Sequence, residues 1–503
     1  MIMAATQSTR QVFISHLLNG LAEIGHDQAV GGIALDSRKV RAGDLFLACH
    51  GSHSEGSSFI NDAIAAGAVA IAIEADQKQV SPAGNIPVIP VMDLRRQAGV
   101  IAARFYDDPS RQMNVIGVTG TNGKTSVTYS VAQALGETGK ACGLVGTLGY
   151  GTVGRLKPGS TTTPDPVTLH CLLSQWHSQQ IGYVAMEVSS HALDQGRVSG
   201  VRFNVAVFTN LSRDHLDYHI TMSRYADAKR LLFVTDALQH AVINLDDVYG
   251  RELVFCTNAG NKVGYSISNE SGQKPAMQIP TVYGVPHVVG EHKSIIDIES
   301  PWGRGQLEVK LIAQFTIANL LASLSVLCVL DVPFSTALES LSRCGGIPGR
   351  MECFGGNSAP LLIVDYAHTP DALKQVLSSL RAVCRGRLVC IFGCGGERDR
   401  GKRPVMGKIA EDYADDIVLT NDNPRGEVPD DIIEDILVGI TDRKRVRIET
   451  DRAIAIERTI RNAEQQDIVV VAGKGHETCQ EIAGRRYPFS DRELVRRLAE
   501  EMQ

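Results

Sequence analysis

The stretch from Met113 to Ser126 constrains the fold more than any other part of this chain, because it joins an apolar strand, a glycine-rich turn and the start of a helix. Its turn reads Gly120-Thr-Asn-Gly-Lys-Thr125, and a helical pattern continues to about Leu135. Glycines let backbone N–H groups close on phosphate oxygens, and a helix N-terminus adds partial positive charge. A lysine and a threonine at the helix start supply a cation and a hydroxyl ligand for Mg²⁺. The sequence therefore predicts a phosphate-binding loop.

This loop departs from the common pattern at one position. Val118 stands where the pattern G-x-x-x-x-G-K-T has its first glycine. The alternative interpretation is a glycine-rich turn whose lysine faces solvent. The order of strand, turn and helix favours nucleotide binding.

Length and composition limit the classes of protein to which this chain can belong. A chain of 503 residues predicts about three domains with separate cores, and a net charge of -6 argues against wholesale nucleic-acid binding. The 11 cysteines have no paired metal-ligand spacing and the N-terminus has no apolar signal core, so we expect reduced thiols and a cytoplasmic protein. The uncharged run from Leu311 to Leu330 contains several polar residues, which favours a buried helix over a transmembrane one.

The spacing of apolar runs predicts an α/β protein of three domains. Residues 1–97 alternate short strands with helices, as in a small α/β domain. Residues 98–346 contain the phosphate loop and predict a central, P-loop ATPase-like, mostly parallel sheet, with an antiparallel addition between Val263 and Val309. Residues 347–503 repeat the alternation and predict a doubly wound, Rossmann-like domain.

Polar motifs in the last domain follow one predicted strand after another. They are Asp365-Tyr-Ala-His-Thr-Pro370, Gly393-Cys-Gly-Gly-Glu-Arg398, Asp422-Asn-Pro-Arg425 and Gly473-Lys-Gly-His-Glu477. Ligands of open α/β sheets bind outside the carboxyl ends of the strands, so this recurrence predicts a ligand site. Arg425 could hold a carboxylate through two parallel hydrogen bonds, although most Asn-Pro turns have no such role. The basic run from Glu397 to Arg403 could hold an anion or form a solvated helix start.

Three features of the central part are candidates for chemistry. Glu187 ends an apolar strand, where it could reach a metal at the phosphate loop or cap the next helix. The run from Thr209 to His219 is dense in His and Asp and could ligate metal, with a solvated turn as the alternative. Lys229 lies in an amphipathic helical pattern, and this pattern alone predicts a surface lysine.

Seven motifs, in this order, resemble those of the Mur ligase family of ATP-dependent amide-forming enzymes. They are Leu35-Asp-Ser-Arg38, Gly120-Thr-Asn-Gly-Lys-Thr125, Met186-Glu-Val-Ser-Ser-His191, Asn210-Leu-Ser-Arg-Asp-His-Leu-Asp-Tyr-His219, Gly349-Arg-Met-Glu352, Asp365-Tyr-Ala-His-Thr-Pro370 and Ala472-Gly-Lys-Gly-His-Glu477. The resemblance covers nearly the whole chain. It implies a domain for UDP, a domain for ATP and a domain for the incoming amino acid.

The turn at Asp422-Asn-Pro-Arg425 is similar to that of family members that add meso-diaminopimelate to UDP-N-acetylmuramoyl-L-alanyl-D-glutamate. The resemblance therefore implies this reaction, with ATP and Mg²⁺ as cofactors and an acyl phosphate as intermediate, in peptidoglycan precursor synthesis. It also implies a monomer with small-molecule substrates, no nucleic-acid partner and no transmembrane segment.

The resemblance assigns residues to each ligand. The expected catalytic residues are Lys124, Glu187, His215 and Lys229, and the expected Mg²⁺ ligands are Thr125, Glu187, His215 and Lys229 as a carbamate. ATP is expected at Gly117, Val118, Thr119, Gly120, Thr121, Asn122, Gly123, Lys124, Thr125, Ser126, Asn319, Arg350 and Asp365. The UDP-linked dipeptide is expected at Leu35, Ser37, Ser52, His53, Ser54, Thr161, Thr162, Thr163, Ser189, Gln195 and Arg197. Diaminopimelate is expected at Arg398, Asp422, Asn423, Pro424, Arg425, Gly473 and Glu477.

One local departure concerns the adenine contact expected of Asn319. The family usually has a Gly and an Asn where Ala313 and Thr316 stand here. Alternative functions are a lysine-adding ligase, a folylpolyglutamate synthase with the same ATP chemistry, or a nucleotide-dependent switch that turns over ATP without an amine acceptor.

Overall fold

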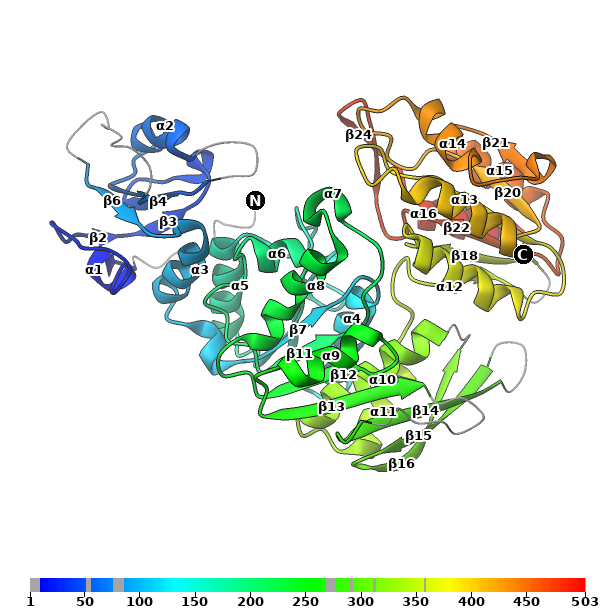
Figure 1. Ribbon diagram of the computed structural model, residues 1–503, viewed down its shortest axis with the longest axis horizontal. Helices are drawn as coiled ribbons and strands as arrows, with labels where there is room; N and C mark the ends of the chain where they lie inside the picture. The colour runs from blue at the N-terminus through cyan, green and yellow to red at the C-terminus, as the bar shows by residue number, and fades with distance from the viewer. Residues whose placement is uncertain are drawn as a thin grey trace.

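Three separate β-sheets organise the computed structural model, which describes residues 10–50, 56–75, 86–267, 277–288, 293–310, 314–356 and 359–502. The sheets follow one another along the chain, and Figure 1 shows them as three lobes, with the central lobe between the other two. The expected α/β class and three-unit architecture are therefore confirmed.

The first unit is a parallel sheet with the order β3-β4-β5-β6. Its elements are β1 (Val12–Phe13), α1 (Ile14–Leu17), β2 (Ala29–Val30), β3 (Gly32–Ala34), η1 (Ser37–Lys39), β4 (Asp44–Ala48), η2 (Gly56–Phe59), α2 (Ile60–Ala65), β5 (Ala70–Glu74), β6 (Val88–Val91) and α3 (Leu94–Phe105). The buried carboxylate of Glu74 accepts the N–H groups of Leu94 and Arg95 at 2.8 and 3.0 Å, which satisfies the start of α3. Helix α3 crosses the expected boundary at residue 97, and its apolar residues as far as Phe105 pack in the first core.

The central unit is a sheet of ten strands in the order β16-β15-β14-β13-β12-β11-β7-β10-β8-β9. Its strands are β7 (Asn114–Thr119), β8 (Cys142–Gly146), β9 (Gly149–Thr152), β10 (Tyr183–Glu187), β11 (Val205–Phe208), β12 (His240–Asn244), β13 (Asn261–Ile267), β14 (Thr281–Val288), β15 (Lys293–Ser300) and β16 (Gly303–Lys310). The expected antiparallel addition is present at β14, β15 and β16. However, β13 pairs with β14 in parallel, so the reversal of strand direction comes one strand later than the sequence pattern predicted.

Helices cover both faces of the central sheet. They are η3 (Pro109–Gln112), α4 (Lys124–Glu137), α5 (Pro166–Ser178), α6 (Ser190–Asp194), α7 (Leu216–His219), α8 (Met222–Arg230), η4 (Leu231–Val234), α9 (Val248–Cys256), α10 (Gln314–Val329) and α11 (Phe334–Arg343). Residues of α4, α10 and α11 form the core on one face, and residues of α5, η4 and α9 form the core on the other. Helix α10 occupies the uncharged run that was expected to be a buried helix, and no described helix has the length and apolarity needed to cross a membrane.

The last unit is a sheet with the order β17-β18-β22-β19-β20-β21, parallel apart from β17. Its elements are β17 (Glu352–Gly355), β18 (Leu361–Asp365), α12 (Pro370–Arg381), β19 (Leu388–Phe392), α13 (Lys402–Tyr413), β20 (Asp416–Leu419), α14 (Pro429–Leu437), η5 (Arg443–Arg445), β21 (Val446–Ile448), α15 (Arg452–Arg461), β22 (Ile468–Ala472), β23 (Cys479–Ile482), β24 (Arg485–Pro488) and α16 (Asp491–Glu501). Helices α12, α13 and α14 pack on one face and α15 and α16 on the other, which is the doubly wound arrangement that was expected.

Candidate active site

The phosphate loop lies between β7 and α4 and is held open by its glycines. Gly123 has a φ of +86°, and a Cβ there would lie 2.4 Å from the side-chain oxygen of Asn319 on α10. A residue with a side chain would therefore be strained and would collide at this position. Asn319 therefore lies against the loop. The adenine contact expected of Asn319 stays a prediction.

Lys124 turns back over the loop instead of facing solvent. Its Nζ donates to the carbonyl oxygens of Gly120 and Thr121 at 2.9 and 2.8 Å, which contradicts the solvent-facing alternative. Burial lowers the pKa of Lys124, and the nearby carboxylates of Glu187 and Asp214 oppose this shift. The loop therefore places a cation at the start of α4, where the first N–H groups of the helix have no intrahelical partner.

Glu187 ends β10 and is almost fully buried. Its carboxylate accepts hydrogen bonds from the N–H of Thr147 at 2.8 Å and from the Thr147 hydroxyl at 3.1 Å. The next helix, α6, is capped by Ser189, whose Oγ accepts the N–H of Ala192 at 3.2 Å. The alternative in which Glu187 caps that helix is therefore wrong.

Lys229 is buried on α8 and is not the surface lysine that its pattern alone predicted. It is 1% exposed, and its Nζ donates to the Gly120 carbonyl at 2.8 Å and lies 4.2 Å from the ring centre of Tyr225. Burial and the nearby charge of Lys124 hold the pKa of Lys229 well below its usual range. The site therefore favours a neutral amine beside the phosphate loop.

Asp214 and His215 form a pair in the middle of the His- and Asp-rich run. His215 has a φ of +53°, and its Nε2 lies 3.4 Å from the carboxylate of Asp214. Burial lowers the pKa of His215 to about 3, although Asp214 acts in the opposite direction. The imidazole is therefore neutral near pH 7 and has a lone pair to offer a ligand.

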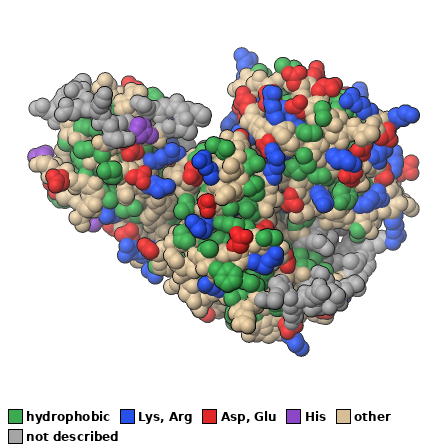
Figure 2. All heavy atoms as spheres, viewed as in Figure 1, with side chains coloured by type: hydrophobic (Ala, Val, Ile, Leu, Met, Phe, Trp, Pro, Cys, Tyr) green, Lys and Arg blue, Asp and Glu red, His purple; other side chains and the backbone are tan. Residues whose placement is uncertain are grey.

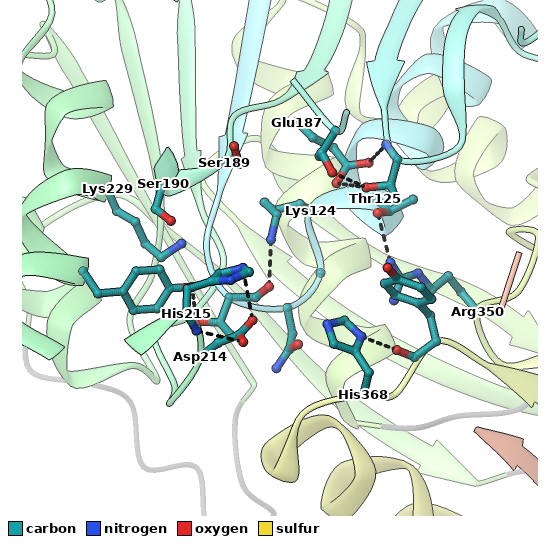
Figure 3. Close-up of a pocket in the computed structure, with 17 residues that line it drawn as sticks. Lys124, Thr125, Glu187, Ser189, Ser190, Asp214, His215, Lys229, Arg350 and His368 are labelled. Atoms are coloured by element: carbon teal, nitrogen blue, oxygen red, sulfur yellow. Dashed lines mark hydrogen bonds and ion pairs between the residues drawn. The ribbon is translucent and has the colours of Figure 1, made fainter. Parts of the chain in front are cut away.

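These side chains line one cavity of about 150 Å³, which Figure 3 shows in close-up. Lys229 and His215 approach it from one side, while Glu187 and Thr125 lie beside the loop. All four expected Mg²⁺ ligands line this cavity: Thr125, Glu187, His215 and Lys229. Their elements are far apart in sequence, so the parallel sheet brings them together at the carboxyl ends of β7, β10 and β11.

The last unit closes the opposite side of the cavity. Arg350, which precedes β17, donates from Nη2 to the Thr125 hydroxyl at 3.1 Å, and its guanidinium lies 4.4 Å from the ring centre of Tyr366. Asp365 accepts the N–H of Met351 at 2.7 Å, and its burial raises its pKa. The segment that carries Arg350 is therefore fixed beside the phosphate loop.

The structure places six of the expected ATP residues in the lining of the cavity. Thr121, Asn122, Gly123, Lys124, Thr125 and Arg350 line the cavity. Gly117 and Val118 instead lie inside β7, where a Cβ on Gly117 would meet the Phe203 ring at 2.7 Å and Val118 is fully buried. Val118 can replace the usual first glycine because its position belongs to the strand core and not to the turn.

The residues expected to bind the dipeptide form a hydrogen-bonded network next to β10. Thr163 donates to the Glu187 carbonyl at 2.9 Å, and Arg197 donates to the Thr163 carbonyl at 3.1 Å and to the Gln195 side chain at 2.6 Å. Thr162 and Ser189 line the cavity, and Thr161 lies in the same segment. Leu35 and Ser37 lie in the first unit, and Ser52, His53 and Ser54 lie outside the described residues.

The residues expected to bind diaminopimelate gather at the carboxyl ends of β19, β20 and β22. The side chain of Asn423 donates to Glu477 at 2.9 Å and accepts from Lys474 at 3.0 Å, and a Cβ on Gly473 would lie 2.6 Å from the Asp422 carboxylate. Arg425 has a φ of +53° and donates from Nη1 to the Gly396 carbonyl at 2.7 Å. Arg398 and Pro424 lie in the same two loops, with Arg398 exposed.

Several residues of the site were not expected from the sequence. The structure adds Thr147, Ser190, Asp214, Tyr225, Tyr366 and His368 to the cavity lining. Asp214, Tyr366 and His368 lie within motifs that had been identified, so their positions after strands were a usable signal. Thr147 follows β8 without any such motif, and only the parallel pairing of β8 with β10 places it near Glu187.

Comparison with known proteins gives matches along most of the chain. Three family models match: the Mur ligase family catalytic domain at residues 29–106, the Mur ligase middle domain at 118–327 and the Mur ligase glutamate ligase domain at 349–475. A protein of Coxiella burnetii named UDP-N-acetylmuramoyl-L-alanyl-D-glutamate--2,6-diaminopimelate ligase is 46% identical, covering 96% of this chain and 99% of its own. A protein of Ectopseudomonas mendocina with the same name is 48% identical over 91% of this chain and 93% of its own.

Solved structures give the same result for the fold. A structure with that ligase name has a TM-score of 0.69 and 33% identity, covering 98% of this chain and 99% of its own. A Mycobacterium tuberculosis folylpolyglutamate synthase has a TM-score of 0.59 and 17% identity, covering 74% of this chain and 91% of its own. At this lower identity the likeness concerns the fold alone.

Proposed function

The chain belongs to the Mur ligase family, and from this premise we propose that it uses ATP to join meso-diaminopimelate to UDP-N-acetylmuramoyl-L-alanyl-D-glutamate. The observation that carries the proposal is the cavity in which a phosphate loop, a buried carboxylate and a buried lysine of the central unit meet Arg350 of the last unit. Relatives named for this reaction support the choice of substrates. The product is a precursor of peptidoglycan, and we expect a cytoplasmic monomer.

The lining of the cavity fits a nucleotide with Mg²⁺. The Thr125 hydroxyl and the Glu187 carboxylate are oxygen donors of the kind that Mg²⁺ prefers. The loop N–H groups, Lys124 and Arg350 would hold the phosphates. Bound there, the metal ion would neutralise charge on the phosphate oxygens.

The protonation state of Lys229 supports a role for this residue in holding Mg²⁺. A neutral amine can attack carbon dioxide, forming an N–C bond and releasing a proton, and the product is an anionic carbamate. The lowered pKa of Lys229 keeps the amine available for this reaction. A carbamate at this position would supply an oxygen ligand in the cavity that Glu187 and His215 also line.

The chemistry follows from the weakness of a carboxylate as an electrophile. Its charge repels an amine, and its oxygen leaves poorly. The D-glutamyl side-chain carboxylate therefore takes the γ-phosphoryl group of ATP, which gives an acyl phosphate and ADP. A neutral amine of diaminopimelate attacks the acyl carbon, phosphate leaves, and Lys124 and Arg350 hold the charge that develops on the phosphate oxygens.

The last unit would choose the amino acid. Arg425 offers a guanidinium that matches a distal carboxylate, and the Asn423–Glu477 pair lies at the neighbouring strand end. Lysine lacks that carboxylate, which favours diaminopimelate over the lysine-adding alternative. For a folylpolyglutamate synthase the support is the fold alone.

The test is release of ADP by the purified protein with ATP, Mg²⁺ and UDP-N-acetylmuramoyl-L-alanyl-D-glutamate. We expect release with meso-diaminopimelate, little with lysine, and none without an amino acid. Equal ATP consumption without the dipeptide and the amino acid would contradict the proposal and would favour a nucleotide-dependent switch.

A further inference from the structure

Two loops of the last unit leave neighbouring strands side by side. Because β19 and β20 are parallel neighbours, the loop at residues 393–398 and the loop at 422–427 emerge at the same edge. The N–H of Gly396 donates to the Asn423 carbonyl at 2.9 Å, and a Cβ on Gly396 would lie 1.9 Å from the Pro424 carbonyl oxygen. The two loops are therefore in direct backbone contact, and a shift in one displaces the other.

Glu427 forms ionic and backbone links between these loops. Its carboxylate accepts from Nη1 and Nη2 of Arg403 at 3.0 Å each, from Arg400 at 2.9 Å, and from the backbone N–H of Glu397. These hydrogen bonds with Arg403 lower the pKa of Glu427 to about 2. The carboxylate is therefore ionised at any pH at which the protein would work.

Arg403 anchors the contacts of Glu427 because its side chain is buried. It is 0% exposed near the start of α13, and its Nη2 also donates to the Gly395 carbonyl at 3.3 Å. Asp435 on the adjacent helix α14 binds the same guanidinium at 2.9 Å, so Arg403 has a second carboxylate to balance its charge. Glu427 differs from Asp435 because Glu427 also connects Arg403 to both loops.

The guanidinium of Arg425 depends on the same backbone. Its Nη1 donates to the Gly396 carbonyl at 2.7 Å, and its Nε lies 3.6 Å from the carboxylate of Glu481, so residues 395–397 and Glu481 together set the direction of the guanidinium. Glu427 fixes residues 395–397 through the Glu397 N–H, and Arg403 fixes them through the Gly395 carbonyl. A bidentate contact with a carboxylate is sensitive to such placement because both hydrogen bonds must align.

We propose that Glu427 is a positioning residue for selection of the amino acid: it holds the two loops at the separation at which Arg425 meets the distal carboxylate of a diacid amine. This inference rests on the proposed function. It makes selectivity depend on a carboxylate that does not itself contact the substrate.

The test compares Glu427→Gln with Asp435→Asn, because both variants remove one carboxylate from the same buried guanidinium. For Glu427→Gln we expect the KM for meso-diaminopimelate to rise about 10- to 100-fold, as expected for a small misplacement of a binding group. The KM values for ATP and for the UDP-linked dipeptide should stay within about twofold, and the preference over lysine should fall by a similar factor. Asp435→Asn should lower the melting temperature and leave all KM values unchanged.

A second variant covers the case in which Glu427→Gln does not fold. Glu427→Gln combined with Arg403→Met removes the buried cation with its partner, and it should show the same rise in KM for meso-diaminopimelate. Equal KM values in Glu427→Gln and Asp435→Asn, or KM values that rise for all three substrates together, would overturn the inference. A wild-type protein that released no ADP with meso-diaminopimelate would instead overturn the proposed function.

Discussion

At the scale of single residues, Arg425 gives the most direct test of substrate choice. Replacing it with Ala removes the partner of the distal carboxylate, so kcat/KM for meso-diaminopimelate should fall steeply while the KM for ATP stays constant. Lysine makes no such contact and should lose little. The ratio between the two amino acids should fall by up to about 10⁴, the discrimination that a site built around a polar contact can reach. Steady-state kinetics with both amino acids measures this ratio, and an unchanged ratio would refute the role of Arg425.

Replacing Lys229 tests whether the group at this position acts as an anion or as a cation. The carbamate proposed here is an anion, so Lys229→Ala should lower kcat by about 10²-fold or more, the typical effect of removing a group that supports transition-state charge. Added formate or acetate should restore part of the activity, because either places a carboxylate in the space left by the side chain. Methylamine should restore none. Rescue by the amine and not by the acids would mean that the lysine acts as a cation.

The burial of Lys229 shows what a sequence pattern leaves open. An amphipathic helix has a buried face and a solvated face, and a lysine is usually assigned to the solvated one. Here Tyr225 and Leu232 lie at helical spacing from Lys229 and are both buried, so the lysine shares their face. That spacing was a signal in the sequence, but which face of α8 is covered depends on α6, α7, η4 and α9, which pack against it only in the folded chain.

At the scale of elements, helix α5 carries a histidine that couples stability to pH. His170 is fully buried, its Nε2 donates to the Ser199 carbonyl at 3.1 Å, and its Nδ1 has no hydrogen-bond partner. Burial lowers the pKa of His170 to about 4, against an ordinary value of 6.5. Between these values the unfolded chain binds a proton that the folded chain does not, so stability is present above pH 6.5 and is lost as the pH falls toward 4.

Chemical unfolding at several pH values would measure this loss. At about 1.4 kcal/mol per pH unit, the contribution of His170 to the free energy of unfolding is about 3 kcal/mol. His170→Gln keeps a donor for Ser199 and removes the titration, so its stability should fall less between pH 6.5 and 4 than that of the wild type. His177→Gln, on the exposed last turn of the same helix, is the matched control. If the slopes of all three proteins coincide, His170 is not the linked group.

Local patterns predicted elements better than they predicted strand directions. The strand, loop and helix from β7 to α4 were predicted because glycine spacing and apolar runs are contained in one short segment. The parallel pairing of β13 with β14 was not, because alternation specifies a strand and says nothing about its neighbour. Helix α3 continues to Phe105 because its apolar stripe runs without a break past residue 97, and the domain boundary expected there stays a prediction.

At the scale of the whole molecule, the cavity exists because two units meet. Thr125, Asn122 and Arg213 of the central unit contact Arg350, Asp371 and Asp399 of the last unit at 3.1, 3.2 and 3.2 Å. These pairs could not be predicted from the sequence, because each joins residues that lie far apart in the chain and depends on how separately folded cores pack. Figure 2 shows the first and last units standing apart, with a notch between them above the central unit. The site therefore combines locally encoded motifs with an arrangement that only tertiary packing supplies.

Separate cores predict separate unfolding. The central core, the core of the first unit and the cores of the last unit are distinct clusters, and the contacts between the central and last units near the cavity are polar. Scanning calorimetry should therefore show more than one transition, as multi-domain proteins commonly do. A non-hydrolysable ATP analogue with Mg²⁺, at about 100 times its Kd, should stabilise the central unit by about 2.7 kcal/mol. For a unit of this size, that is a shift of about 5 to 10 °C in one transition.

The variant Lys124→Ala distinguishes stabilisation through nucleotide binding at the phosphate loop from a general stabilisation of the protein by the added nucleotide. Because Lys124 supplies the full positive charge of the loop, its loss should abolish most of the shift while leaving the other transitions where they are in the wild type. A shift spread equally over all transitions would mean that the nucleotide stabilises every unit, and it would contradict binding at the phosphate loop of the central unit alone. A single transition whose calorimetric and van't Hoff enthalpies agree would contradict independent unfolding. It would mean that contacts between units, such as the packing of Phe315 against the core of the last unit and of Val167 against the core of the first, couple the three units.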